Sequence, residues 1–139
     1  MSWTQLKISV GVGGAIVTGA LAAMLGGWDM WLKALIIFVV LDYLSGVMAA
    51  ATQKKLNSEV GYKGIIKKVF VFVLVAVAFE VDILLGTNAV RIAVIGFYLG
   101  TEGLSILENA GKAGIPLPEP LKQALIQIRG EENWQQRNI

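Results

Sequence analysis

Several ionisable side chains lie inside long apolar stretches of this sequence. Among them are Asp42 in the stretch 31–51, Glu80 and Asp82 in 69–85, and Arg91 and Glu102 in 89–107. A charged side chain at the centre of a lipid bilayer costs about 2.5–3.5 kcal/mol on insertion scales. Such groups therefore usually face the interior of a helix bundle, an opposite charge or water. These residues predict a membrane protein whose polar interior matters for function.

The residue types argue against most catalytic chemistry. The chain has no Cys, which excludes disulfides and thiolates, and no His, which removes the commonest metal ligand and proton carrier near neutral pH. Its glycines do not follow a strand in the pattern of a phosphate-binding loop. The carboxylates at membrane depth have no evident substrate pocket. We therefore expect no enzyme activity, no metal and no cofactor.

The composition indicates which elements carry these side chains. Of 139 residues, 55% are hydrophobic and only 16% are charged, whereas soluble domains have about 25% charged residues. A helix needs about 20 mostly apolar residues to cross a bilayer. We expect an all-α integral membrane protein with four transmembrane helices arranged as two hairpins. The four helices are expected at 8–28, 31–51, 69–85 and 89–107.

Two of these segments have alternatives. The first resembles a secretory signal peptide, because Lys7 precedes the apolar run and Ala20-Leu21-Ala22 is similar to a cleavage site. Its length favours a retained helix. The fourth segment contains Arg91, Glu102 and three glycines, so it could lie partly in the membrane interface. We favour a full crossing, because three crossings would place two basic regions on opposite faces.

Lysines between the second and third segments predict the orientation. By the positive-inside rule this basic loop is cytoplasmic, and with four crossings both termini are cytoplasmic too. The net charge of +2 is thereby explained without a nucleic-acid partner. The expected location is a bacterial cytoplasmic membrane, crossed several times. The lysines of the basic loop are Lys54, Lys55, Lys63, Lys67 and Lys68.

Small residues recur at every fourth position of the first segment. Such a row forms a smooth groove that lets another helix approach closely. Packing against another subunit and packing within the chain remain equally plausible interpretations. The row consists of Gly11, Ala15, Gly19, Ala23 and Gly27.

Polar side chains predict an interior or pore-lining surface. Asp42 has two interpretations, a protonated structural residue or a residue that lines a hydrated path. Glu102, Ser105 and Asn109 follow Tyr98 on one helical face, which is too polar to face lipid. With Glu80, these residues form the predicted polar interior. Asp82 and Arg91 flank a short outer turn, so we expect them to form a structural ion pair.

The end of the chain changes character after residue 110. Prolines and glycines between 111 and 120 interrupt a continuing helix. Leu121, Leu125 and Ile128 then recur at helical spacing, which predicts a short amphipathic helix. We expect a transmembrane domain at 1–110 and a cytoplasmic tail at 111–139, with a solvated end at 130–139.

Several segments together resemble the phage holins of the toxin-secretion/phage-lysis type. The resemblance covers about 35–125 and includes Asp42 with Gly46, Gly61 and Gly64 beside Lys67-Lys68, and Asp82. Its most specific parts are Glu102-Gly-Leu-Ser-Ile-Leu-Glu-Asn-Ala110 and Gly114-Ile-Pro-Leu-Pro118 followed by Leu121.

The resemblance implies a function that the residues alone do not. Holins gather as homo-oligomers in the cytoplasmic membrane and open lesions, through which an endolysin reaches the peptidoglycan. Direct contact with the endolysin is not implied. Two alternatives remain open: a small ion channel or transporter that uses the same acids, and an antiholin-like regulator that delays lysis.

Overall fold

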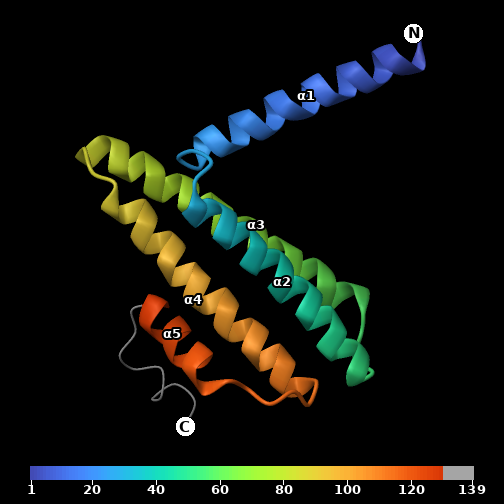
Figure 1. The fold of residues 1–139 in the computed structure, drawn as a ribbon, viewed down its shortest axis with the longest axis vertical. Coiled ribbons are helices and arrows are strands. Elements are labelled where there is room, and N and C mark those ends of the chain that lie inside the picture. The colour runs from blue at the N-terminus through green and yellow to red at the C-terminus, as the bar shows by residue number, and fades with distance from the viewer. Residues whose placement is uncertain (130–139) are drawn as a thin grey trace.

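The computed structural model describes residues 1–129, which form five helices joined by short loops. The predicted all-α class is therefore confirmed for these residues, and residues 130–139, the expected solvated end, lie outside the described part. Figure 1 shows the arrangement. The helices are α1 Trp3–Met24, α2 Met30–Thr52, α3 Ser58–Leu85, α4 Ala89–Lys112 and α5 Glu119–Arg129.

Local sequence signals set the ends of these helices. Ser2 and Gln5 form a capping box at the start of α1, and Asp29 caps α2 by accepting a hydrogen bond from the Leu32 amide at 2.9 Å. Gly26 and Gly27, with φ of 89° and 99°, make the turn after α1. Residues with a side chain rarely adopt these angles, so the two glycines separate α1 from α2.

The core lies where α2, α3 and α4 meet. Leu35, Val75 and Ile95 are fully buried, one from each of these helices. Val39, Val71 and Leu99 extend the same cluster. On its other side α4 packs against α5, so α4 lies between α2 and α5 in Figure 1. The helix with the most polar interior face is therefore also the central helix of the bundle.

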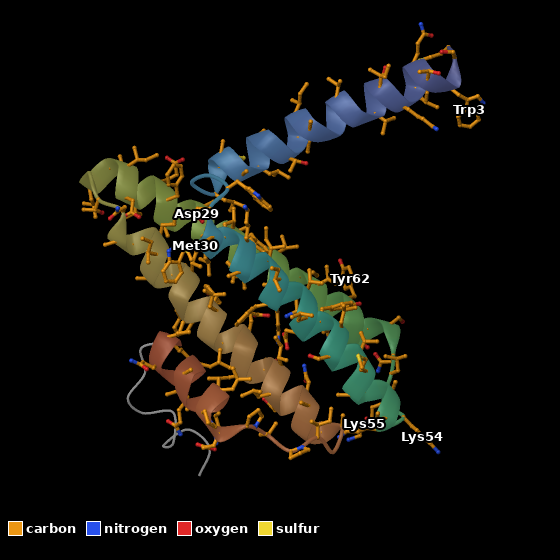
Figure 2. The ribbon with its side chains drawn as sticks, viewed as in Figure 1. Trp3, Asp29, Met30, Lys54, Lys55 and Tyr62 are labelled. Carbon is orange, nitrogen blue, oxygen red and sulfur yellow. The ribbon has the colours of Figure 1, made fainter. Side chains whose placement is uncertain are left out.

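Helix α1 extends away from this bundle and has no buried residue. The expected first hairpin of α1 and α2 is thus joined in sequence but not packed side by side. Trp3 lies at the far tip of α1, whereas Lys54 lies at the opposite end of the bundle (Figure 2). Gly27 also leaves the predicted small-residue row, because it belongs to the turn and not to the helix.

Three helices of the described residues are long and apolar enough to cross a membrane: α1, α2 and α4. The fourth predicted segment, for which an interfacial position was the alternative, is one of them. Helix α3 is not, because lysines in its first half and Glu80 and Asp82 near its end interrupt every stretch of spanning length. The four predicted crossings are therefore reduced to three candidates, and a crossing by α3 stays a proposal.

Helix α3 begins at Ser58, much earlier than the predicted start at residue 69. Lys63, Lys67 and Lys68 consequently belong to the helix, and only Lys54 and Lys55 lie in the loop that was expected to hold all five lysines. The sequence contains no Pro here to interrupt the first turns, and Glu59 pairs with Lys63 one turn later at 2.7 Å. The basic loop is thus shorter than predicted.

Candidate functional site

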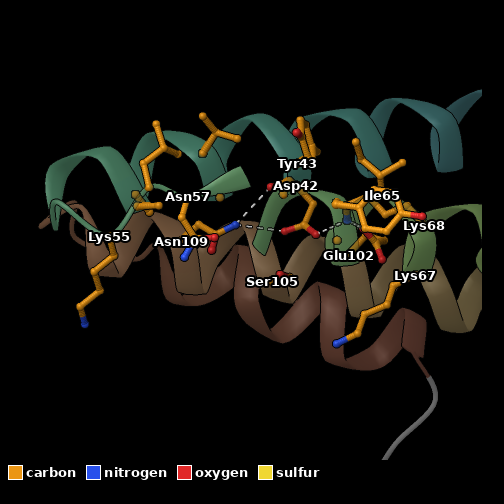
Figure 3. A pocket seen from close by; sticks show the side chains of 18 of the residues that line it. Asp42, Tyr43, Lys55, Asn57, Ile65, Lys67, Lys68, Glu102, Ser105 and Asn109 are labelled. Carbon is orange, nitrogen blue, oxygen red and sulfur yellow. Dashed lines mark hydrogen bonds and ion pairs between the residues drawn. The ribbon is translucent and has the colours of Figure 1, made fainter. Parts of the chain in front are cut away.

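A buried ion cluster connects the three helices of the bundle. The Lys68 ammonium on α3 donates to the Asp42 carboxylate on α2 and to Glu102 Oε2 on α4, the latter at 2.7 Å. Figure 3 shows the two carboxylates converging on this ammonium. The three side chains are 9–16% exposed. Each helix therefore contributes one charge to a site that is largely shielded from solvent.

An amide on α4 completes the hydrogen bonding of Asp42. Asn109 Nδ2 donates to Asp42 Oδ1 at 3.1 Å and to Ser45 Oγ at 2.9 Å. The Ser45 hydroxyl in turn donates to the Asp42 carbonyl at 3.0 Å. Asp42 is thus held on both sides, by Lys68 and by Asn109 (Figure 3). Buried polar groups need such partners, because an unsatisfied one costs about 1–3 kcal/mol.

The electrostatics of the cluster depend on Lys68. Removing one member of a buried ion pair leaves its partner without compensation, which typically costs about 3–5 kcal/mol. Two carboxylates share a single ammonium here, so the cluster carries one negative charge in excess when all three groups are ionised. The packing of α2, α3 and α4 is therefore coupled to the charge of these side chains.

A cavity of about 1280 Å³ opens beside the cluster, between α2, α3 and α4. Tyr43, Tyr98 and Ser105 line it together with the ion cluster, and apolar side chains such as Leu74 form part of its wall. Lys55 and Lys67 border it and extend away from the cluster in Figure 3. The cavity gives the buried charges a potential route to water.

The structure brings together four of the five residues predicted for the polar interior. Asp42, Glu102 and Asn109 belong to the cluster or bond to it, and Ser105 lines the adjoining cavity. Sequence reasoning missed Lys68, which it had assigned to the basic loop. The sequence does contain an indication of this role. Lys68 directly precedes the apolar run of α3, which is where an internal counter-charge for the acids would be expected.

Glu80 does not belong to this interior. Its side chain is exposed on α3, and no hydrogen bond or ion pair joins it to another residue in the described part of the chain. The helical period explains why Glu80 does not lie in the predicted polar interior. Val71, Val75, Ala78 and Asp82 form the buried face of α3, and Glu80 lies on another face.

Asp82 and Arg91 are in contact, but not through the predicted side-chain pair. The Asp82 carboxylate accepts hydrogen bonds from the Arg91 amide at 2.7 Å, the Val90 amide at 3.0 Å and the Thr87 hydroxyl at 2.6 Å. Asp82 thus binds the first amides of α4, which lack partners within that helix. Its role is to join α3 to the start of α4.

The Arg91 guanidinium binds the turn between α1 and α2. Its Nη1 lies 2.6 Å from Asp29 Oδ2, and its other nitrogens donate to the carbonyls of Leu25 and Gly27. A methyl group on Gly26 would lie 2.4 Å from Arg91 Nε, so only glycine leaves room for this contact. The hydrogen bond from Arg91 is the main reason that the pKa of Asp29 lies below its usual value.

Comparison with protein families gives a match over most of this architecture. The bacteriophage holin family matches residues 19–130, which include α2, α3, α4, α5 and the ion cluster. The chain belongs to this family. The sequence resemblance to holins is thereby confirmed, and it supports a membrane protein with a holin-like, non-enzymatic role.

The chain is similar to bacterial and phage proteins, one of which is named a probable holin. A protein of Halalkalibacterium halodurans is 40% identical over 125 residues, covering 86% of this chain and 93% of the relative. A 14.9 kDa protein from the nagH 3′ region of Clostridium perfringens is 44% identical over 109 residues, covering 77% and 83%. A probable holin of Bacillus phage phi105 is 30% identical over 112 residues, covering 80% and 83%. No solved structure matches this chain.

Proposed function

We propose that this protein is a holin of a bacterial cytoplasmic membrane. It gathers there as a homo-oligomer and opens lesions that depolarise the membrane and release an endolysin to the peptidoglycan. The observation that carries the proposal is the family match over residues 19–130. The probable holin of phage phi105 adds support at the level of a single relative. The endolysin is a functional partner, and direct contact with it is not required.

The proposed membrane placement has four crossings, with α3 as the fourth. Its charges are compatible with a crossing because most have a partner or a short route to the interface. Lys68 is neutralised by Asp42 and Glu102, and Asp82 binds the amides of α4. Lys67 is exposed, and its long side chain can extend toward the headgroups. The loop with Lys54 and Lys55, and both termini, then lie in the cytoplasm.

The ion cluster suggests how a closed bundle opens. In the packed bundle each charged group of the cluster bonds to an oppositely charged one, which suits a protein that accumulates without leaking ions. When subunits rearrange, water enters from the cavity and hydrates Asp42, Lys68 and Glu102 individually. Hydration then stabilises the open arrangement, because separated charges are far more favourable in water than in lipid.

Inducible expression with a co-expressed endolysin tests the function. Membrane potential and endolysin release are followed together in cells that express the native chain, Asp42→Asn or Glu102→Gln. We expect cells that express the native chain to lose their membrane potential and release the endolysin in a single step. Cells that express either variant should take this step at a different time. Glu108→Gln is the matched control, because Glu108 is exposed and its ion pair within residues 1–129 is with Lys112, one turn away.

The same experiment separates the alternatives. Depolarisation without endolysin release would indicate a small ion channel or transporter. Continued growth, together with delayed lysis by a second holin, would indicate an antiholin-like regulator. Normal timing in both variants would contradict the proposed role of the ion cluster and leave the lesion-forming function in place.

A further inference from the structure

Helix α5 packs against α4 along a row of glycines. A methyl group on Gly100 would lie 2.4 Å from Arg129 Cβ and 2.8 Å from the Leu125 carbonyl oxygen. One on Gly103 would lie 2.5 Å from Leu125 Cδ2. Atoms at these distances overlap, so the glycines allow the two helices to touch. We call Gly96, Gly100 and Gly103 the glycine seat; Gly96 faces the Ile128 carbonyl at the same contact.

Apolar and aromatic contacts hold α5 on this seat. Leu125 is 4% exposed and clusters with Leu104 and Leu107 of α4. The Arg129 guanidinium lies 5.4 Å from the centre of the Phe97 ring, a cation–π contact. Helix α5 is therefore a packed part of the bundle and runs back along α4, as Figure 1 shows.

This packing carries α5 to the middle of α4. Helix α4 has 24 residues, and Gly100 is its twelfth. At about 1.5 Å per residue α4 is about 36 Å long, close to what a hydrocarbon core of about 30 Å requires. If α4 crosses the membrane, Arg129 lies level with the bilayer centre.

The surface of α5 is unsuited to lipid at that depth. Gln123 and Gln127 are exposed on the side away from α4. Gln123 donates to Glu119 Oε1 on the same helix at 2.6 Å. The Gln127 amide, if it faced acyl chains, would lack a hydrogen-bond partner, and an arginine charge at that depth costs about 2.5–3.5 kcal/mol on insertion scales. Water removes both penalties. By contrast, the exposed residues in the middle of α2 are apolar, for example Val40 and Leu41.

We propose that α5 is a re-entrant helix in a water-filled recess of the membrane domain. The glycine seat fixes it there, so the α5 side of α4 is the aqueous side of the molecule and the exposed face of α2 is the lipid side. The inference rests on the crossing by α4 that forms part of the proposed function. It assigns the two sides of the subunit without requiring that lesions form.

Single cysteines test this assignment, because the native chain contains none. Gln127→Cys and Leu41→Cys are compared in intact membranes with a charged, water-soluble thiol reagent applied from the cytoplasmic side. We expect Gln127→Cys to react at least about tenfold faster, because a charged reagent is strongly excluded from lipid. Both variants should react equally after denaturation. Equal, slow labelling in membranes would overturn the proposal.

Two further variants separate the possible failures. Gly103→Cys combined with Leu125→Cys should form a disulfide under oxidation, because the two positions are in contact. Absence of that cross-link would show that α5 is not seated and would also overturn the proposal. Asn88→Cys reports the crossing itself, since it should react only from the outer side. If it reacts only from the cytoplasmic side, the proposed membrane placement fails, and the recess with it.

Discussion

Lys68 supplies the positive charge to which both Asp42 and Glu102 are bonded. Replacing it with Gln leaves two carboxylates close together, with a neutral amide in place of their counter-ion. We expect Lys68→Gln to lower the stability of the folded protein by about 3–5 kcal/mol. Thermal unfolding in detergent measures the loss. The matched control is Lys67→Gln, the neighbouring but exposed lysine, which should change stability little. Equal stability of the two variants would contradict the structural role of Lys68.

Asp29 offers a second test, through its depressed pKa. A carboxylate whose pKa is lowered by folding stabilises the protein above its ordinary pKa of 3.8, and the stabilisation is lost as the pH falls through the lowered value. Asp29 is 42% exposed, so solvent screening limits the effect to about 1 kcal/mol or less. Asp29→Asn keeps a residue suited to cap α2 but removes the charge that faces Arg91.

We therefore expect Asp29→Asn to be slightly less stable at neutral pH. Unfolding temperatures measured at neutral pH and near pH 3 provide the comparison. The native chain should lose more stability on acidification than the variant, because only the native chain has this carboxylate to protonate. Identical acid profiles would show that the Arg91 contact depends on the carbonyls of Leu25 and Gly27 alone.

At the level of residues, the sequence predicted which polar groups are internal better than it predicted their partners. Asp42, Glu102 and Asn109 could be recognised because each interrupts or ends an apolar stretch. Arg91 was matched with Asp82 because they are close in sequence. Its guanidinium instead reaches Asp29, far away in the chain. A pairing of this kind depends on how helices pack, which hydropathy alone does not specify.

The helices themselves were largely predictable, because long apolar stretches between short turns leave few alternatives. Predicted and observed bounds of α2 differ by one residue at each end. The start of α3 was wrong, because hydropathy locates the apolar part of a helix and not the charged turns that precede it. The glycine seat was also missed. Its role is evident only from the structure, in which α5 packs against Gly96, Gly100 and Gly103.

The seat predicts opposite effects for two Gly→Ala substitutions in helices. Gly100→Ala should displace α5, since its methyl group overlaps Arg129. Gly64→Ala in α3 meets no atom within 4 Å, and should stabilise its helix by up to about 1 kcal/mol.

Trypsin cleavage after Lys122, followed by mass spectrometry, reports the position of α5. Cleavage should accelerate several-fold in Gly100→Ala and stay unchanged in Gly64→Ala. The same rate in both would contradict the seat.

At the scale of the whole molecule, α1 is the one helix without a buried residue in the described part of the chain. Atoms added at Gly11 and Gly19 of α1 would meet nothing within 4 Å, and no residue of this helix is buried. Within residues 1–129, the internal-packing interpretation of the small-residue row thus has no support. We therefore expect Gly19→Leu to weaken oligomers in a cross-linking assay. Val17→Leu, on the same helix but outside the row, is the control. Oligomers that survive Gly19→Leu unchanged would assign assembly to another surface.

The contact between Arg91 and the turn after α1 has a mechanical consequence. Helix α1 has 22 residues and is therefore a rigid rod about 33 Å long, fixed to the bundle only near one end. A tilt of about 10° at that pivot would swing the tip at Trp3 by about 6 Å, roughly half the width of a helix. Small rearrangements around the pivot are thus magnified at the tip, which is the part of α1 that lies farthest from the bundle.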